Sequence, residues 1–163
     1  MFSANALQAT DKPGQYAELA EQVRGLLHGE RDRIANAANF ASLVYHALAE
    51  VNWAGFYFYD GHELVVGPFQ GQPACIRIAL GKGVCGTAAV TGESQVVHDV
   101  SAFAGHIACD SASQSEVVVP LFDGQRLVGV WDVDSPHIGR FDEADRAGME
   151  KLAAIFMESI RET

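Results

Sequence analysis

The polar segment 105–116, which reads GHIACDSASQSE, carries the side chain best suited to covalent chemistry in this sequence, the thiol of Cys109. The segment contains serines and acids but almost no large apolar residue, and it stands between apolar, strand-like runs. Functional sites concentrate in polar insertions of this kind. We therefore predict a small-molecule pocket around this segment, with Cys109 as its nucleophile. The other residues that we expect at this pocket include Cys75, Cys85, Asp132 and Asp134.

Three cysteines in separate segments allow more than one kind of chemistry. A zinc site would take Cys75, Cys85 and Cys109 together with His98 or His106. The sequence has no close pair such as CxxC, which is the strong part of a zinc signal, and this argues against metal binding. Isolated cysteines are also commonly buried and inert. That alternative suits Cys109 poorly, because its neighbours are small and polar.

A cysteine nucleophile supports either acyl transfer or thiol redox chemistry. A hydrolase needs a base beside the nucleophile, and His106, close to Cys109 in the sequence, remains a candidate for that base. Three cysteines are more than a hydrolase needs, however. A nucleophile with one or two resolving thiols explains the number better, because a thiolate that is oxidised to a sulfenic acid condenses with a second thiol to form a disulfide.

The composition limits the class of protein. The 163 residues, 48% hydrophobic and 20% charged, indicate one globular domain over 1–163 with a full-sized core. A net charge of -10 and scattered Lys and Arg argue against nucleic-acid binding, which needs a basic surface. No apolar run approaches the roughly 20 residues that span a membrane, and the N-terminus lacks the pattern of a secretory signal. We therefore expect a cytoplasmic protein, in which cysteines are more often free, catalytic or metal-bound than paired in structural disulfides.

Hydrophobic periodicity predicts helices at both ends of the chain and a sheet between them. After a loose lead-in over 1–14, helical spacing covers 16–27 and 32–50, and Asp142 is expected to cap the last helix. Two Asp-Gly pairs, at 60–61 and 123–124, are typical of tight hairpin turns. Short connections of this kind favour an α+β fold with a central antiparallel sheet. The N- and C-terminal helices would pack on one face and leave the other face for a ligand pocket.

The first strand and one short helix are expected to position site residues. Trp53 and Tyr57 share one face of the first strand and would form a wall of the pocket, while the phenylalanines on the other face pack on the helices. The glycine turn before Cys85 does not match a phosphate-binding loop and leads into a short helix. The N-terminus of that helix would lower the pKa of the Cys85 thiol. Further strands are predicted at 75–79 and 95–100.

Three segments of the chain, GKGVCGTAAVTGE, GHIACDSASQSEVVVPLF and LVGVWDVDSP, resemble those of the free methionine-R-sulfoxide reductases, a branch of the GAF-domain family. The resemblance extends from about Asn36 through the last helix. Its motifs are specific, because ordinary GAF sensor domains lack cysteines at these three positions. The resemblance implies the GAF fold and an enzyme that reduces the R epimer of free methionine sulfoxide without a metal or an organic cofactor.

The resemblance also implies roles for the three thiols. Cys109 would be the attacking thiol, Cys75 the main resolving thiol and Cys85 a further thiol of less defined role. Thioredoxin would then reduce the disulfide. A homodimer is compatible with a bundle of terminal helices. The alternative to an enzyme is a GAF module that binds a small ligand and regulates a partner.

The remaining roles are hypotheses that combine residue types with this resemblance. A sulfoxide oxygen leaves poorly unless it is protonated, so the site needs a proton donor, for which Glu116 and Asp134 are candidates. Two carboxylates held close together raise the pKa of one of them. Asp132 would hold the substrate ammonium or share in proton donation. The two aromatic residues of the pocket wall would clasp the methyl–sulfur end, and backbone amides of 105–109 would bind the carboxylate.

Overall fold

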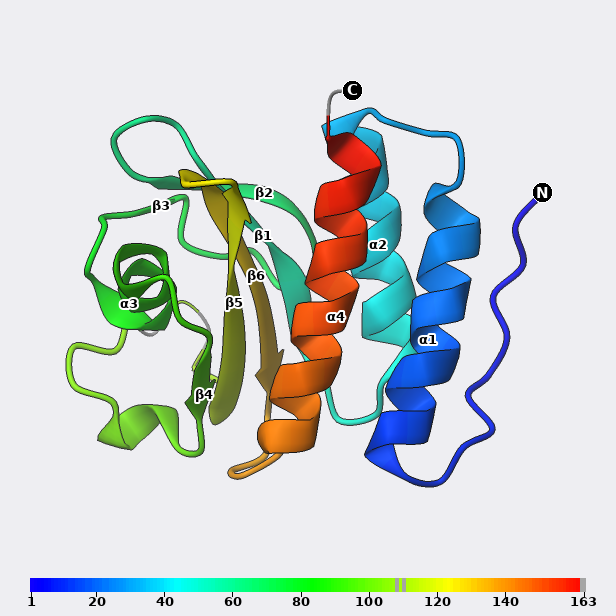
Figure 1. Ribbon diagram of the computed structural model, residues 1–163. Coiled ribbons are helices and arrows are strands. Elements are labelled where there is room, and N and C mark those ends of the chain that lie inside the picture. Colours follow the sequence, from blue (N-terminus) through cyan, green and yellow to red (C-terminus); the bar gives the residue numbers. More distant parts are fainter. Residues whose placement is uncertain (108, 110, 162–163) are drawn as a thin grey trace.

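The computed structural model describes residues 1–107, 109 and 111–161, and it shows an α+β fold with the predicted order of elements (Figure 1). Six strands form one antiparallel sheet in the order β3-β2-β1-β6-β5-β4. In the described part of the chain, no helix is both long enough and apolar enough to cross a membrane. The elements are α1 (Lys12–Leu27), α2 (Arg33–Ala47), β1 (Trp53–Tyr59), β2 (Leu64–Gly71), β3 (Arg77–Ile78), α3 (Gly83–Thr91), β4 (Gln95–Val97), a 3-10 turn (Val100–Ala102), β5 (Ser115–Asp123), β6 (Arg126–Ser135) and α4 (Glu143–Ile160).

The sheet separates two hydrophobic clusters. Helices α1, α2 and α4 lie on one side of it, and α3 packs against β5 and β6 on the other side (Figure 1). Phe56 and Phe58 of β1 belong to the cluster under the three helices, whereas Trp53 and Tyr57 belong to the cluster beside α3. This confirms the predicted division of the first strand and the predicted packing of the terminal helices on one face.

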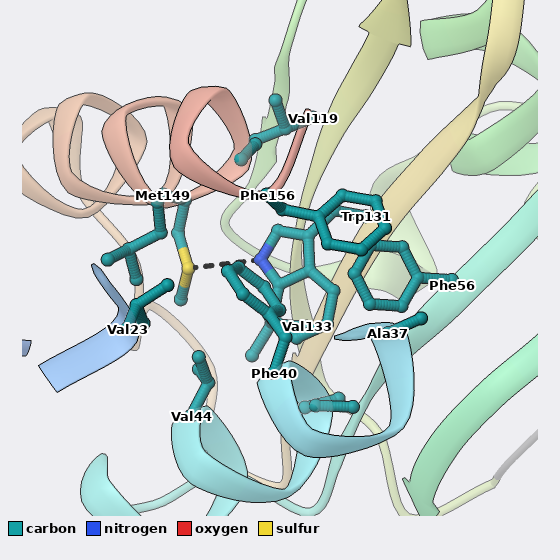
Figure 2. Close-up of a cluster of buried hydrophobic side chains, with 14 of the residues drawn as sticks. Val23, Ala37, Phe40, Val44, Phe56, Val119, Trp131, Val133, Met149 and Phe156 are labelled. Atoms are coloured by element: carbon teal, nitrogen blue, oxygen red, sulfur yellow. Dashed lines mark hydrogen bonds between the residues drawn. The ribbon is translucent and has the colours of Figure 1, made fainter. Parts of the chain in front are cut away.

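Trp131 of β6 lies at the centre of the core under the helices (Figure 2). Its ring is fully buried, and the rings of Phe40 and Phe56 lie 4.6 and 4.8 Å from it. Its indole N–H donates to the sulfur of Met149 in α4, 3.4 Å away. Burial of one phenylalanine side chain contributes roughly 1.5–3 kcal/mol. This packing anchors β6, whose alternate side chains face the opposite side of the sheet.

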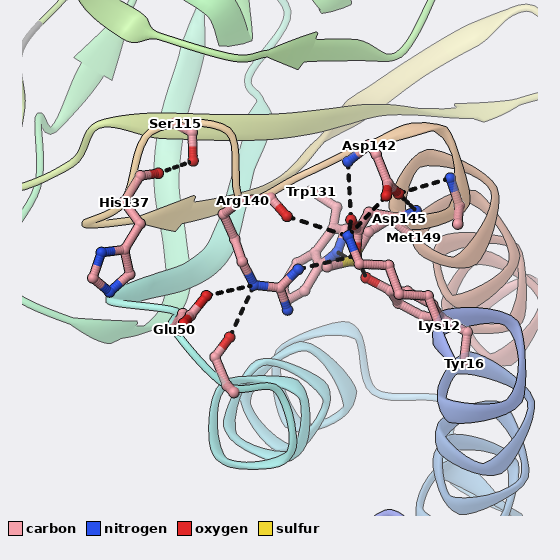
Figure 3. Close-up of polar contacts among 12 residues, drawn as sticks. Lys12, Tyr16, Glu50, Ser115, Trp131, His137, Arg140, Asp142, Asp145 and Met149 are labelled. Atoms are coloured by element: carbon pink, nitrogen blue, oxygen red, sulfur yellow. Dashed lines mark hydrogen bonds and ion pairs between the residues drawn. The ribbon is translucent and has the colours of Figure 1, made fainter. Parts of the chain in front are cut away.

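Asp145, in the first turn of α4, ties α4 to α1 (Figure 3). Its buried carboxylate accepts a hydrogen bond from the Tyr16 hydroxyl at 2.7 Å and pairs with Lys12 at 2.6 Å and Arg140 at 3.3 Å. Asp142 caps the helix with its side chain and donates its backbone N–H to Asp145, which confirms the predicted N-cap. A buried charge is costly unless it is paired and hydrogen-bonded, and here it is both.

The N-terminal boundary differs from the prediction. Residues 12–14 are not part of a loose lead-in but form the first turn of α1, because Pro13 needs no amide hydrogen bond at the start of a helix. The preceding segment is docked rather than loose. The backbone amides of Gln8 and Ala9 donate to the Glu18 carboxylate on α1.

One helix and two strands are shorter in the structure than in the prediction. Helix α2 ends at Ala47 rather than at residue 50, because the backbone turns away there and Glu50 adopts a φ of 61°. In the run 75–79, only Arg77–Ile78 pairs with β2, so Cys75 lies in the preceding loop and not in a strand. In the run 95–100, the strand ends at Val97 because the chain enters a 3-10 turn.

Candidate functional site

Three predicted site residues form a row across the face of the sheet that α3 covers. In the register of the antiparallel strands, Glu116 of β5 lies opposite Asp134 of β6, and Asp134 lies opposite Trp53 of β1. Directly opposite residues point to the same side of a sheet and lie close enough to interact. The two candidate proton donors and one aromatic wall residue are therefore neighbours, although they come from three separate strands.

The next row combines an acid with a glycine. Asp132 lies opposite Gly55 on β1, and the indole of Trp53 extends over this glycine, where a Cβ would come within 2.7 Å of it. The glycine lets the indole stack on Tyr57, with ring centroids 5.9 Å apart, and on Phe69, with centroids 5.2 Å apart. The predicted aromatic wall is thus formed beside the acids, and its shape depends on Gly55.

Helix α3 places Cys85 against the acids. Cys85 is buried in the first turn of the helix, as predicted, and its Sγ lies 3.5 Å from Asp132 and 3.9 Å from Glu116. Burial, together with the charges of these acids, raises the pKa of Cys85 well above its ordinary value. The expectation that the helix N-terminus lowers this pKa is wrong, because desolvation and nearby carboxylates outweigh the helix dipole. Cys85 is therefore a neutral thiol that donates a weak hydrogen bond.

A disulfide joins Cys75, in the loop after β2, to Cys109 in the polar segment. The two Cα atoms are 5.3 Å apart and both residues are half-buried. This is the pair that the family resemblance implied, and Cys85 is the free cysteine. The bond links the polar segment to the loop between β2 and β3, and so closes the segment over the face of the sheet that carries the acids.

A cavity of about 40 Å³ lies between the sheet, α3 and the polar segment. It brings together every predicted site residue except Cys75, which is itself bonded to one of them. This volume is well below the roughly 300–1,000 Å³ of pockets that hold small-molecule ligands. The disulfide-linked structure is thus a closed form of the site. The predicted residues that line the cavity are Trp53, Tyr57, Cys85, Cys109, Glu116, Asp132 and Asp134.

The pKa values of two carboxyl groups in the cavity are raised above their ordinary values. Asp132 is buried, and its desolvation together with the charges of Asp134 and Glu116 raises its pKa well above the ordinary value. Burial also raises the pKa of Glu116, while a hydrogen bond from Asp132 opposes that rise. The larger rise is that of Asp132, which therefore retains a proton more readily than Glu116 does. The sequence assigned this acid to the substrate ammonium, with a share in proton donation as the alternative.

Two polar groups of the site were missed by sequence reasoning. Ser113, inside the polar segment, donates to Asp134 at 3.5 Å and accepts from Asn52 at 3.4 Å. Lys82, at the N-cap of α3, also lines the cavity. Nothing in its local sequence distinguished Ser113 from the neighbouring serines. Lys82 was visible only as the lysine of a glycine turn that fails the phosphate-loop pattern.

Two of the loop amides that were expected to bind the substrate carboxylate are hydrogen-bonded within the loop. The amides of His106 and Cys109 donate to carbonyl groups of Phe103 and Ile107, within 3.2 Å. Because the loop uses these two donors for its own turns, they are not available to a ligand in this arrangement. Residue 108, which was part of the same expectation, lies outside the described residues.

The zinc alternative is not assembled either. Cys75 and Cys109 are bonded to each other, and the exposed His98 does not line the cavity. Within the described ranges, the side chains that do come within 4.8 Å of one another are those of Cys85, Glu116 and Asp132. The pKa of Cys85 is raised well above its ordinary value, which keeps the thiol protonated at neutral pH, whereas a cysteine must be deprotonated to bind a metal.

His106 lines the cavity, but it does not form the base of a hydrolase in this structure. Burial lowers its pKa, which favours the neutral ring at pH 7. The sulfur of Cys109, which it would have to activate, is held in the disulfide.

The sequence and the fold are similar to those of known proteins. The GAF domain family matches residues 32–160. The chain is 47% identical to the free methionine-R-sulfoxide reductase of Escherichia coli over 139 residues, which are 85% of this chain and 84% of the relative. It superposes with a TM-score of 0.94 on the free methionine-R-sulfoxide reductase of Neisseria meningitidis in complex with its substrate, at 43% identity over 98% of this chain and 96% of that chain. A GAF sensor protein from Burkholderia vietnamiensis superposes with a TM-score of 0.90, at 62% identity over 94% of this chain and 100% of that one.

Proposed function

Because this chain belongs to the GAF-domain family and, within it, to the free methionine-R-sulfoxide reductases, we propose that it reduces free L-methionine (R)-S-oxide to L-methionine. The observation that carries this proposal is the disulfide between Cys75 and Cys109, which borders a cavity lined with acids. Thiol-based sulfoxide reduction needs a pair of cysteines that can close into a disulfide and a proton source beside them. The site contains both.

Cys109 is the attacking thiol, since it is the member of the pair that lines the cavity. Its thiolate attacks the sulfoxide, takes over the oxygen with a proton and becomes a sulfenic acid, while methionine leaves as the thioether. The Cys75 thiol then attacks the sulfenic sulfur, and the hydroxyl group leaves as water. The product is the disulfide of this structure. These steps need no metal or organic cofactor, and a dithiol such as thioredoxin returns the two electrons.

The acid cluster supplies the proton that the sulfoxide oxygen needs. Asp134 and Glu116 face each other across the strands and are the donors to the oxygen, and Asp132 stores the proton between turnovers. Entry of a substrate ammonium beside Asp132 favours the charged form of its carboxyl group. The proton then passes to Glu116, with which Asp132 shares a hydrogen bond. Binding of the amino group and protonation of the sulfoxide are coupled in this way.

Recognition of both ends of the substrate explains the selection of a free amino acid. Asp132 has one carboxyl oxygen without a hydrogen-bond partner in the described structure, and it can accept from an ammonium group. Lys82 on the same cavity provides the positive charge for the carboxylate. Trp53 and Tyr57 contact the methyl–sulfur end, since sulfur and aromatic rings attract each other modestly. A peptide-bound residue lacks both charged groups.

The closed cavity orders the events of the cycle. A volume of about 40 Å³ does not hold methionine sulfoxide, so the segment that carries Cys109 moves before the substrate enters. Reduction of the disulfide releases this segment. The enzyme is thus ready for substrate only after a reductant has acted, and this requirement suits a reducing compartment such as the cytoplasm.

The test uses the separate R and S epimers of free methionine sulfoxide, with dithiothreitol as the reductant. We expect loss of the R epimer alone, with no loss in the Cys109→Ser variant. Cys85→Ser is the matched control, because it makes the same substitution at a cysteine that is outside the disulfide. If the wild-type protein consumes neither epimer, the chain is a ligand-binding GAF module, and its cavity residues bind a metabolite without changing it.

A further inference from the structure

Two exposed isoleucines flank the disulfide. Ile76 follows Cys75 in the chain and is 68% exposed, and Ile107, two residues before Cys109, is 38% exposed. Exposed apolar groups that gather at one place mark interaction surfaces. In the described part of the chain, the other exposed large apolar residues are Met1, Phe2, Ile34, Val90 and Ile138.

The surface beside the disulfide is fixed in place by its neighbours. The carbonyl of Ile76 accepts from the backbone N–H of Val66 in β2 at 2.9 Å. Ile107 lies over Gly83 at the start of α3, where an added Cβ would come within 3.2 Å of its side chain. The two isoleucines are thus held by the sheet on one side and by α3 on the other, with the disulfide linking their two loops.

The two sulfur atoms of the disulfide are not equivalent. Cys109 lines the closed cavity, whereas Cys75 does not line it, and both residues are partly exposed. A thiol carried by another protein cannot enter a cavity of about 40 Å³. It therefore meets the disulfide from the solvent side, on which Ile76 is exposed. Ile107 lines the cavity and is also 38% exposed.

We propose that Ile76, Ile107 and Cys75 form the docking surface for a dithiol protein of the thioredoxin class, whose thiolate attacks the Sγ of Cys75. This inference rests on the proposed function, because a disulfide that forms in every turnover needs a reductant. The surface suits such a partner because its apolar groups immediately adjoin the one bond that the partner must reach. When the thiol of a protein reductant reaches the disulfide, the residues around that thiol are brought close to the surface beside it. An apolar surface at this place allows them to pack against it.

The exchange balances as two displacements. The partner thiolate attacks Cys75, the S–S bond breaks, and its electron pair leaves with Cys109 as a thiolate. The second partner thiol, after loss of its proton, attacks the mixed disulfide at the partner sulfur and releases Cys75, which takes up a proton. The partner is oxidised to a disulfide and the enzyme gains two electrons. Attack at Cys75 returns Cys109 as a thiolate to the cavity, in the form that the next substrate needs.

The first experiment identifies the sulfur that is attacked. Oxidised full-length protein is mixed with a thioredoxin whose second active-site cysteine is replaced by serine, then quenched in acid, alkylated and mapped by mass spectrometry. We expect the adduct on the peptide that contains Cys75, with Cys109 alkylated. An adduct on Cys109, or no adduct at all, would overturn the proposal.

The second experiment tests the docking surface. Ile76→Asp is compared with Ile34→Asp, which places the same charge on an isoleucine that is 54% exposed on α2, on the other side of the sheet. We expect Ile76→Asp to raise the KM for thioredoxin about tenfold, as expected for a residue of moderate weight in an interface. Ile34→Asp should leave this KM unchanged. An equal KM for Ile76→Asp and wild type would contradict the docking surface.

Turnover with dithiothreitol separates this proposal from the proposed function. Dithiothreitol is small and needs no docking surface, so both variants should consume the R epimer at the wild-type rate. If the wild-type protein has no activity with dithiothreitol, the proposed function fails. If it is active with dithiothreitol while thioredoxin forms its adduct on Cys109, only the assignment of the attacked sulfur fails.

Discussion

Glu116 and Asp134 lie directly opposite each other on β5 and β6, with both side chains in the same cavity. Like charges in this position destabilise a pair of strands. Burial and these acidic neighbours raise the pKa of the adjacent Asp132, which therefore holds a proton more readily than an exposed aspartate does. The charge repulsion that opposes folding therefore also favours a protonated carboxyl group in the cavity.

Removal of either member of this pair should slow the reaction without loss of the thiol chemistry. General acid catalysis contributes about 10²–10⁴-fold in rate, so we expect Glu116→Gln and Asp134→Asn each to lower kcat for the R epimer by about 10²-fold or more. Both variants should still form the Cys75–Cys109 disulfide with hydrogen peroxide. Glu150→Gln, an exposed acid on α4, is the control. Wild-type kcat in both site variants would rule out this proton donor pair.

The raised pKa of Asp132 should affect how the free energy of unfolding depends on pH. A carboxyl group whose pKa is higher in the folded state than in the unfolded state stabilises the folded protein. This contribution is fully present below the unfolded pKa, here 3.8, and it is lost as the pH rises through the folded pKa. Asp132→Asn removes this loss and keeps a hydrogen-bond donor towards Glu116. We therefore expect the variant to gain stability over wild type as pH increases from 4 to 8, measured by urea unfolding of the oxidised proteins. A difference that is constant over this range would show that Asp132 is ionised in the fold.

Much of the fold could be predicted because local patterns and tertiary packing agree. The alternation of Trp53 and Tyr57 with Phe56 and Phe58 assigned both faces of β1 correctly. The predicted bounds of helices and strands were wrong where contacts with residues distant in the sequence determine the end of an element. Strand β3 is short because it pairs with β2 over Arg77–Ile78 alone, and no local pattern shows where a sheet edge ends.

The structure brings the predicted site residues, apart from Cys75, to one cavity, but sequence reasoning did not predict the shifts of their pKa values. Local sequence left open whether the acids of β6 face solvent, and only the register with β5 and β1 places them in a cavity. The pKa of Cys85 was predicted in the wrong direction for the same reason. Its helix position was visible in the sequence, but the carboxylates that surround it arrive from Glu116 and Asp132, 31 and 47 residues further along the chain.

Burial and a raised pKa should make Cys85 unreactive in the native protein. Alkylation requires the thiolate, and the acids around this thiol disfavour it. We expect iodoacetamide at pH 8 to label no cysteine of the oxidised native protein, and to label Cys85 alone once urea unfolds it without reduction. Mass spectrometry of the intact chain gives the count. Labelling of Cys85 in the native state would contradict the neutral, buried thiol.

Loss of Cys75 should separate the chemical step from recycling. In Cys75→Ser, Cys109 can still reduce one sulfoxide, but its sulfenic acid has no partner with which to close the disulfide. We expect one equivalent of methionine per chain, a dimedone adduct on Cys109 and no further turnover with thioredoxin. Cys85→Ser should continue to turn over. If instead Cys75→Ser recycles and Cys85→Ser stops after one equivalent, then Cys85 is the resolving thiol.

The hydrogen bond between Tyr16 and Asp145 should contribute to stability and not to catalysis. The hydroxyl donates at 2.7 Å to a buried carboxylate on the far side of the sheet from the cavity. Hydrogen bonds to charged groups contribute about 1.5–3 kcal/mol, so Tyr16→Phe should lower the free energy of unfolding by an amount in this range. Tyr45→Phe is the control, because the Tyr45 hydroxyl makes no hydrogen bond with the residues that the structure describes. Urea unfolding gives the free energies, and kcat with dithiothreitol should equal that of wild type in both variants. An unchanged free energy for Tyr16→Phe would mean that Lys12 and Arg140 alone compensate the buried charge of Asp145.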